Sequence, residues 1–105
     1  MIEKLDLSGG VITYNEFNID PDLPLQEQLF SLTEDLLQIS YCNGKYLIDV
    51  GWYPEFSVQG SFMIRVIKDY DWLNPIFKKK VKSLEMVTRY LQKAVKIVEE
   101  VLKTE

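Results

Sequence analysis

The residues of this sequence that could do chemistry are carboxylates, because the chain contains no histidine and a single cysteine, Cys42. Without histidine, neither Ser-His nor Cys-His nucleophile pairs can form, and the usual Cys/His zinc sites are excluded as well. No glycine loop of the phosphate-binding types is present. What remains is acid-base catalysis by two carboxylates, for which Asp49 with Glu55 and Asp69 with Asp71 are the candidates. Since any acidic chain offers such pairs, we expect no enzyme, no cofactor and no metal site.

The same carboxylates lie among aromatic residues in two short segments. One is IDVGWYPEFSVQGSF, residues 48 to 62, and the other is DYDWLNP, residues 69 to 75. Aromatic anchors combined with charges that steer a partner are typical of protein interfaces. We therefore predict partner-binding residues at two alternative places: Asp49, Tyr53, Glu55 and Phe56 at one, and Asp69, Tyr70, Asp71 and Trp72 at the other.

The charges are distributed unevenly along the chain. The net charge is −4, but residues 1 to 60 carry ten acidic and two basic side chains, whereas residues 61 to 105 carry six acidic and ten basic ones. An acidic surface repels the phosphates of nucleic acids and attracts basic partners. The composition therefore favours a basic protein partner and disfavours nucleic-acid binding.

Length and composition predict one globular domain in a reducing compartment. The chain has 105 residues, of which 47% are hydrophobic and 27% charged, as is usual for a globular protein that buries one core. A lone cysteine forms no disulfide framework, and we expect Cys42 to be a small core residue. The start, MIEKLDLSGG, has no signal-peptide pattern, and no segment reaches the length of a membrane span. We expect a cytoplasmic protein without membrane contact.

The elements that must position these residues follow from local patterns. Residues 11 to 19 are rich in β-branched and aromatic types and predict a strand, and Pro24 opens a short helix over residues 24 to 33. Asn43-Gly44 supplies the two positive-φ positions of a type I′ turn and predicts a hairpin of residues 36 to 42 with 45 to 53. An alternative is that the helix continues through Ile39 and ends at Gly44.

The second half of the chain predicts two more strands and a long helix. Residues 61 to 68 alternate as a strand, and residues 76 to 83 form a lysine-bearing edge strand. Ser83 then caps a helix with one apolar stripe: Leu84, Val87, Tyr90, Leu91, Ala94, Val95, Val98, Val101 and Leu102. We predict a two-layer α+β domain with about five antiparallel strands and the last helix across one face.

The two aromatic segments flank the strand of residues 61 to 68. A strand of about nine residues spans about 30 Å, so the loops 52 to 60 and 69 to 75 lie at opposite ends of it. The Asn43-Gly44 turn is expected at the same end of the sheet as the loop 69 to 75. Residue 36 is expected at the opposite end, with the loop 52 to 60. The two sets of partner-binding residues are therefore expected to remain separate.

The run LIDVGWYPEFSVQGSFMIRVIKDYDWLNPI, followed by a lysine-bearing strand and a helix, resembles small intracellular immunity proteins of bacterial polymorphic-toxin and contact-dependent growth-inhibition systems. The resemblance spans about residues 34 to 100. It implies a monomer or weak homodimer that binds one cognate toxin domain, commonly a nuclease, and blocks it without catalysis. Two alternatives remain open: a small acidic binding module for another protein or ligand, and a carboxylate-dependent enzyme.

Overall fold

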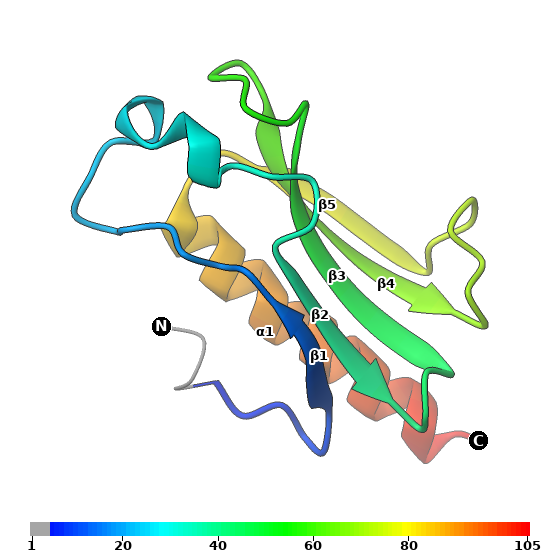
Figure 1. Cartoon of the computed structure of the whole chain (residues 1–105). Helices are drawn as coiled ribbons and strands as arrows, with labels where there is room; N and C mark the ends of the chain where they lie inside the picture. The colour runs from blue at the N-terminus through cyan, green and yellow to red at the C-terminus, as the bar shows by residue number, and fades with distance from the viewer. Residues whose placement is uncertain (1–4) are drawn as a thin grey trace.

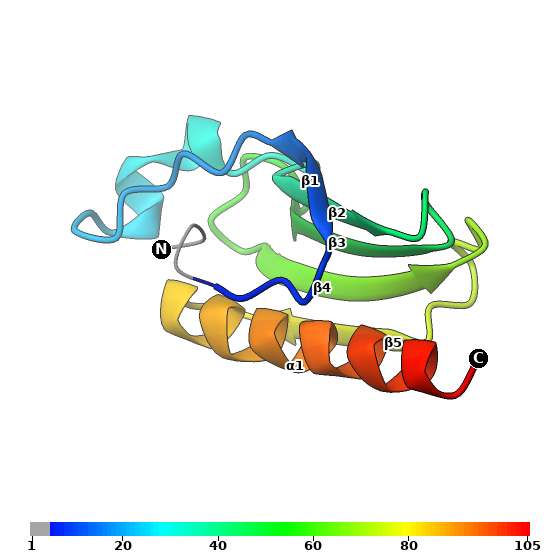
Figure 2. The ribbon, with the colours of Figure 1, turned by 90° about the horizontal axis from the view of Figure 1, so that it is seen from below.

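The computed structural model describes residues 5 to 105 of the chain. Glu3 and Lys4, counted above among the charges, and the first residues of the segment that lacks a signal pattern lie outside this range. The described chain forms one antiparallel sheet in the order β1-β2-β3-β4-β5, and helix α1 crosses one face of it (Figures 1 and 2). The predicted α+β arrangement of a five-stranded sheet and a C-terminal helix is confirmed. Within residues 5 to 105 no α-helix covers the opposite face of the sheet, and we call it the open face.

The strands are connected in the simplest way, each pairing with the next along the chain. Their bounds are Val11–Asn15 for β1, Leu37–Tyr41 for β2, Tyr46–Tyr53 for β3, Ser61–Lys68 for β4 and Phe77–Val81 for β5. Every neighbouring pair is antiparallel. The edges of the sheet are therefore β1 and β5, and the lysine-bearing strand lies at an edge as predicted.

Helix α1, Leu84–Lys103, forms where the apolar stripe predicts it. Ser83 accepts a hydrogen bond from the Met86 N–H at 3.3 Å, which confirms the N-cap. The fully buried positions of the stripe pack on β3, β4 and β5: Val87, Leu91, Ala94, Val95 and Val98. The core consists of this stripe and the inward side chains of the strands.

The β2–β3 hairpin is confirmed, and the alternative of a helix through Ile39 is wrong. Asn43 and Gly44 have φ of 56° and 93°, and the Lys45 N–H donates to the Cys42 carbonyl at 3.3 Å. Cys42 also has a positive φ, 52°. Its side chain is exposed at the turn, so the prediction of a buried core thiol is wrong: the register places Tyr41 and Tyr46, not Cys42, as the last inward pair.

Two predictions for the first half of the chain were too long. β1 ends at Asn15 because the Asn15 side chain accepts a hydrogen bond from the Phe17 N–H at 3.1 Å, which turns the chain. The expected helix over residues 24 to 33 is two separate 3-10 turns, Leu25–Glu27 and Leu29–Ser31. Gln28, between them, has a non-helical backbone. Its side chain instead bonds both the N–H and the carbonyl of Asp20 at 2.8 Å.

Candidate functional site

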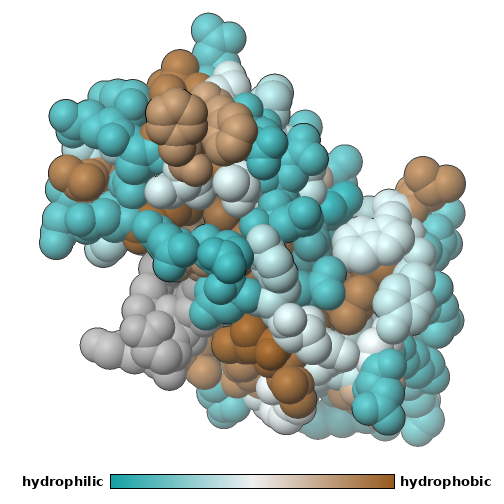
Figure 3. All heavy atoms as spheres, viewed as in Figure 1, coloured by the Kyte–Doolittle hydropathy of each residue, from teal (hydrophilic) through white to brown (hydrophobic). Residues whose placement is uncertain are grey.

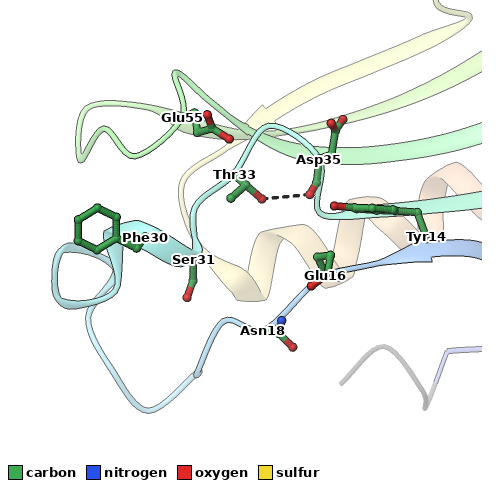
Figure 4. Close-up of a pocket in the computed structure, with 8 residues that line it drawn as sticks. All are labelled: Tyr14, Glu16, Asn18, Phe30, Ser31, Thr33, Asp35 and Glu55. Carbon is green, nitrogen blue, oxygen red and sulfur yellow. Dashed lines mark hydrogen bonds between the residues drawn. The ribbon is translucent and has the colours of Figure 1, made fainter.

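A pocket of about 320 Å³ lies beside the 3-10 turns, at the end of the sheet where β3 runs into β4 (Figure 4). Three separate stretches of the chain contribute to its wall: the end of β1 with the residues after it, the segment from the second 3-10 turn to β2, and the β3–β4 loop. The lining residues are Tyr14, Glu16, Asn18, Phe30, Ser31, Thr33, Asp35 and Glu55. We call this site the acidic pocket, because its charged residues are all carboxylates.

Hydrogen bonds join these stretches: the Glu16 N–H, after β1, donates to the Leu36 carbonyl at 2.8 Å. The Trp52 N–H donates to the Thr33 carbonyl at 2.9 Å, and the Phe56 N–H donates to the Leu32 carbonyl at 2.8 Å. The Glu55 carboxylate accepts from the Glu34 N–H at 3.3 Å. The segment from residue 32 to 35 is thus tied to the β3–β4 loop by both backbone and side chain.

Gly51 allows that segment to lie directly on the sheet. A Cβ built at residue 51 would be 1.9 Å from the Glu34 carbonyl oxygen, a backbone atom. Any other residue here would push the segment away from β3. The glycine of GWYPE therefore shapes the wall of the acidic pocket. A glycine inside a strand suggests that another backbone approaches closely, but it does not identify which one.

Two phenylalanine rings lie exposed at this end of the molecule. Phe30 is 88% exposed and Phe56 44% exposed, and their ring centroids are 5.8 Å apart. Phe56 has a positive φ of 62°, which is rare for an aromatic residue. Figure 3 shows apolar atoms gathered at this end of the open face, beside hydrophilic ones. An exposed aromatic pair next to carboxylates is a combination suited to anchoring a partner.

The carboxylates of the acidic pocket have no cationic partner among the described residues. Among residues 5 to 105, no lysine or arginine forms an ion pair with Glu16, Asp35 or Glu55. All three residues are exposed. The pocket can therefore receive an ammonium or guanidinium group with carboxylates on several sides and aromatic surface at the rim.

Asp49 is placed differently from its prediction as a partner-binding residue. Its side chain is only 5% exposed and accepts a hydrogen bond from Arg65 Nη2 at 2.8 Å. Burial raises the pKa of Asp49, and the hydrogen bond and charge of Arg65 partly offset that rise. Asp49 is thus occupied by Arg65 inside the protein and offers a partner no free carboxylate.

Tyr53 and Trp72 meet at the same arginine. Tyr53 OH accepts a hydrogen bond from Arg65 Nη2 at 3.1 Å, and the Arg65 guanidinium lies 5.6 Å from the Tyr53 ring centre and 5.3 Å from that of Trp72. The expectation that the two loops contribute to separate sites is therefore wrong for these two residues. The loop after β4 folds back along the open face, which brings Trp72 to mid-strand.

The remaining predicted residues lie at the far end of the sheet, as expected from the length of β4. The Asp69 N–H donates to the Lys45 carbonyl at 2.8 Å, which joins this loop to the Asn43-Gly44 turn. Tyr70 is 59% exposed and lies against Gly44. The Asp71 carboxylate accepts two hydrogen bonds from the Asn74 amide, at 3.2 and 3.3 Å. The loop is exposed, and the Asp71 carboxylate is engaged by the Asn74 amide.

Of the eight predicted partner-binding residues, only Glu55 lines the acidic pocket, with Phe56 beside it. Sequence reasoning missed Glu16, Phe30 and Asp35: Glu16 lies 14 residues before Phe30, and Asp35 lies 20 residues before Glu55. One signal was available for Phe30: it falls outside the apolar spacing of Leu25, Leu29 and Leu32. A large apolar residue off that stripe predicts exposure.

Comparisons with known proteins give no relative: no protein-family model, curated protein or solved structure matches the chain. Within residues 5 to 105, no group of three or more His, Cys, Asp or Glu side chains is arranged to hold a metal ion. The only long helix in that range, α1, is too polar to cross a membrane.

Proposed function

We propose that this protein is an immunity protein, which binds a cognate toxin domain and neutralises it by occupying its surface, without catalysis. The observation that carries the proposal is the acidic pocket: Glu16, Asp35 and Glu55 line a hollow to which residues 5 to 105 contribute no lysine or arginine, and Phe30 and Phe56 lie exposed beside it. Such a site is complementary to a basic surface that carries Lys or Arg side chains.

The chemistry of a nuclease explains why an acidic site would inhibit it. A nuclease binds its substrate through basic side chains that contact phosphates. Carboxylates that take the place of those phosphates would fill the same groove and exclude the substrate. In this mechanism the aromatic pair supplies buried apolar area, and the carboxylates speed encounter and select a basic partner. The protein would act in the cytoplasm, as a monomer or weak homodimer.

The test is a pull-down from the source organism, followed by mass spectrometry, with two baits. One bait is the wild type, and the other carries Glu16→Lys, Asp35→Lys and Glu55→Lys. We expect the wild type to enrich a protein that the variant does not, and we expect that protein to contain a basic domain that stops growth when expressed alone.

Coexpression then separates inhibition from mere binding. The wild type should restore growth of cells that express the captured domain, and the triple variant should not. The matched control is Asp69→Lys with Asp71→Lys, which reverses carboxylates at the other end of the sheet and should still protect. A captured protein that is harmless when expressed alone would refute the proposed function.

A further inference from the structure

The two edges of the sheet are protected very differently. β5 carries Lys78, Lys79 and Lys80, all exposed, and lysines on an edge strand prevent pairing with other chains. β1 has the sequence VITYN, without a charge, and all five of its residues are exposed. Val11 is 63%, Ile12 38% and Tyr14 42% exposed. An uncharged, apolar edge is a feature that soluble proteins normally avoid.

The outer side of β1 presents free backbone groups. The Glu16 N–H donates to the Leu36 carbonyl at 2.8 Å, directly beside the Asn15–Leu37 pair of the β1–β2 ladder. In an antiparallel ladder, hydrogen-bonded and non-hydrogen-bonded pairs alternate. The N–H and carbonyl of Asn15 therefore point away from β2, toward solvent. An added strand could bond them.

The β1 edge is continuous with the acidic pocket. Tyr14, within β1, and Glu16, the residue after it, both line that pocket. Tyr14 also lines a second hollow of about 250 Å³ with Asp35 and Asp49. A strand added along β1 would run toward Glu16 and Asp35, so its basic side chains could reach these two exposed carboxylates.

We infer that β1 is extended by a strand of the basic partner, which joins the sheet at this edge and places a Lys or Arg side chain in the acidic pocket. This inference rests on the proposed function and adds the mode of recognition. The charges favour a basic strand over a second copy of this chain. A second copy would pair through its own β1, which carries no lysine or arginine, whereas a basic strand brings a cation to the carboxylates.

The experiment uses three capped peptides of about ten residues, the length of a long strand. The first alternates Val and Thr and ends in two arginines, the second ends in two glutamates instead, and the third is the arginine peptide with N-methylated backbone amides. Each is titrated into the isotopically labelled protein and followed by nuclear magnetic resonance and amide hydrogen exchange. The arginine peptide should shift the β1 resonances and slow exchange of the Asn15 amide.

The glutamate peptide and the N-methylated peptide should each bind with an affinity at least about tenfold lower. The glutamates are repelled by the carboxylates of the acidic pocket, and the N-methylated backbone has no N–H groups to donate to β1. Val11→Lys in the protein should weaken binding of the arginine peptide by a similar factor. It places on β1 an exposed lysine like those of β5, which disfavour pairing with another strand. Leu73→Lys is the matched control, because Leu73 is 91% exposed in the loop after β4. It should leave binding unchanged.

Three results would overturn the inference. One is equal binding of the N-methylated peptide, which would mean that no ladder forms. Another is concentration-dependent self-association that slows Asn15 exchange without peptide, which would identify a second copy as the occupant. The third is a complex with the captured toxin domain in which Asn15 exchanges as fast as in the free protein; the proposed function would then stand while strand addition falls.

Discussion

Arg65 stabilises a carboxylate that burial makes costly to ionise. Asp49 is nearly inaccessible, and its pKa is raised by burial even though Arg65 donates a hydrogen bond to it. The desolvation of Asp49 therefore outweighs the attraction of its partner, as is common for buried ion pairs. Arg65 itself keeps one buried atom, Nε, without a hydrogen-bond acceptor among residues 5 to 105. Arg65 therefore compensates the buried carboxylate only in part.

Arg65→Met should therefore lower the free energy of unfolding by about 3 kcal/mol at pH 7, since it leaves a buried carboxylate without a cation. Methionine preserves most of the apolar stem of Arg65 and removes the guanidinium that lies near the Tyr53 and Trp72 rings. Adding Asp49→Asn should restore most of the loss, because no buried charge then remains. Urea denaturation measures all three proteins. A loss below about 1 kcal/mol for Arg65→Met, in the range of surface pairs, would contradict this account.

The raised pKa of Asp49 also fixes the sign of a pH dependence. The pKa of Asp49 in the folded protein lies above the ordinary value of 3.8. At a pH between these two pKa values, the folded state holds a proton that the unfolded state has released. Stability from this group is present below pH 3.8 and is lost as pH rises through the folded pKa. Relative to Asp49→Asn, the wild type should lose stability as pH rises from about 3 to 7. Urea denaturation of wild type and Asp49→Asn across that range measures the difference in their free energies of unfolding. A wild type that gains stability relative to Asp49→Asn as pH rises would contradict this prediction.

Among the elements, α1 and the segment from residue 32 to 35 have different structural roles. The helix covers one face of the sheet and closes the core, whereas the segment lies on the open face and builds the acidic pocket. The first depends on a stripe of apolar side chains, and the second on backbone contacts that Gly51 permits. Substitutions in the two should therefore have separable effects.

Leu91→Ala should lower the free energy of unfolding by about 2 to 4 kcal/mol, the cost of a cavity in a packed core. Leu91 is completely buried in the middle of α1. Lys93→Ala, at an exposed position of the same helix, is the control and should change stability by less than about 0.5 kcal/mol. Denaturant midpoints measure both. Equal midpoints for wild type and Leu91→Ala would show that the helix packs through another face.

Gly51→Ala should displace the Glu34 carbonyl and with it the wall of the acidic pocket. The expected cost is about 1 to 3 kcal/mol, as for overpacking elsewhere in protein cores. The position-specific readout is the exchange rate of the Trp52 and Phe56 amides, which donate to this segment and should exchange faster. Unchanged rates for both amides would mean that the segment accommodates a methyl group at no cost.

Local patterns predicted most of the fold. The Ser83 cap, the stripe of α1, the Asn43-Gly44 turn and the strand of residues 61 to 68 all depend on neighbours within a few positions. The failures depend on contacts between distant residues. Gln28 interrupts the predicted helix by bonding Asp20, and Trp72 reaches Arg65 because its loop folds back over the sheet. The hydrophobic periodicity of a sequence reflects only neighbouring positions, so it does not predict contacts between distant residues.

The whole molecule converts the uneven charge of the sequence into an uneven surface. Residues before 61 form β1, β2, β3 and their loops, and residues after 60 form β4, β5 and α1. The acidic pocket lies on the first side and the exposed lysines of β5 on the other. The sequence predicted this division but not where the carboxylates converge, because Glu16, Asp35 and Glu55 come together only through the sheet.

We propose that a basic partner docks at the acidic pocket. The most direct test is calorimetry of the captured toxin domain with wild type, with Glu16→Lys plus Glu55→Lys, and with Asp69→Lys plus Asp71→Lys. The pocket variant should lose about 2 kcal/mol of binding free energy or more, as expected for interfacial charges that lose their partners. The distal variant should bind like wild type, and both should remain folded. Wild-type affinity in the pocket variant, or an equal loss in both variants, would contradict the claim.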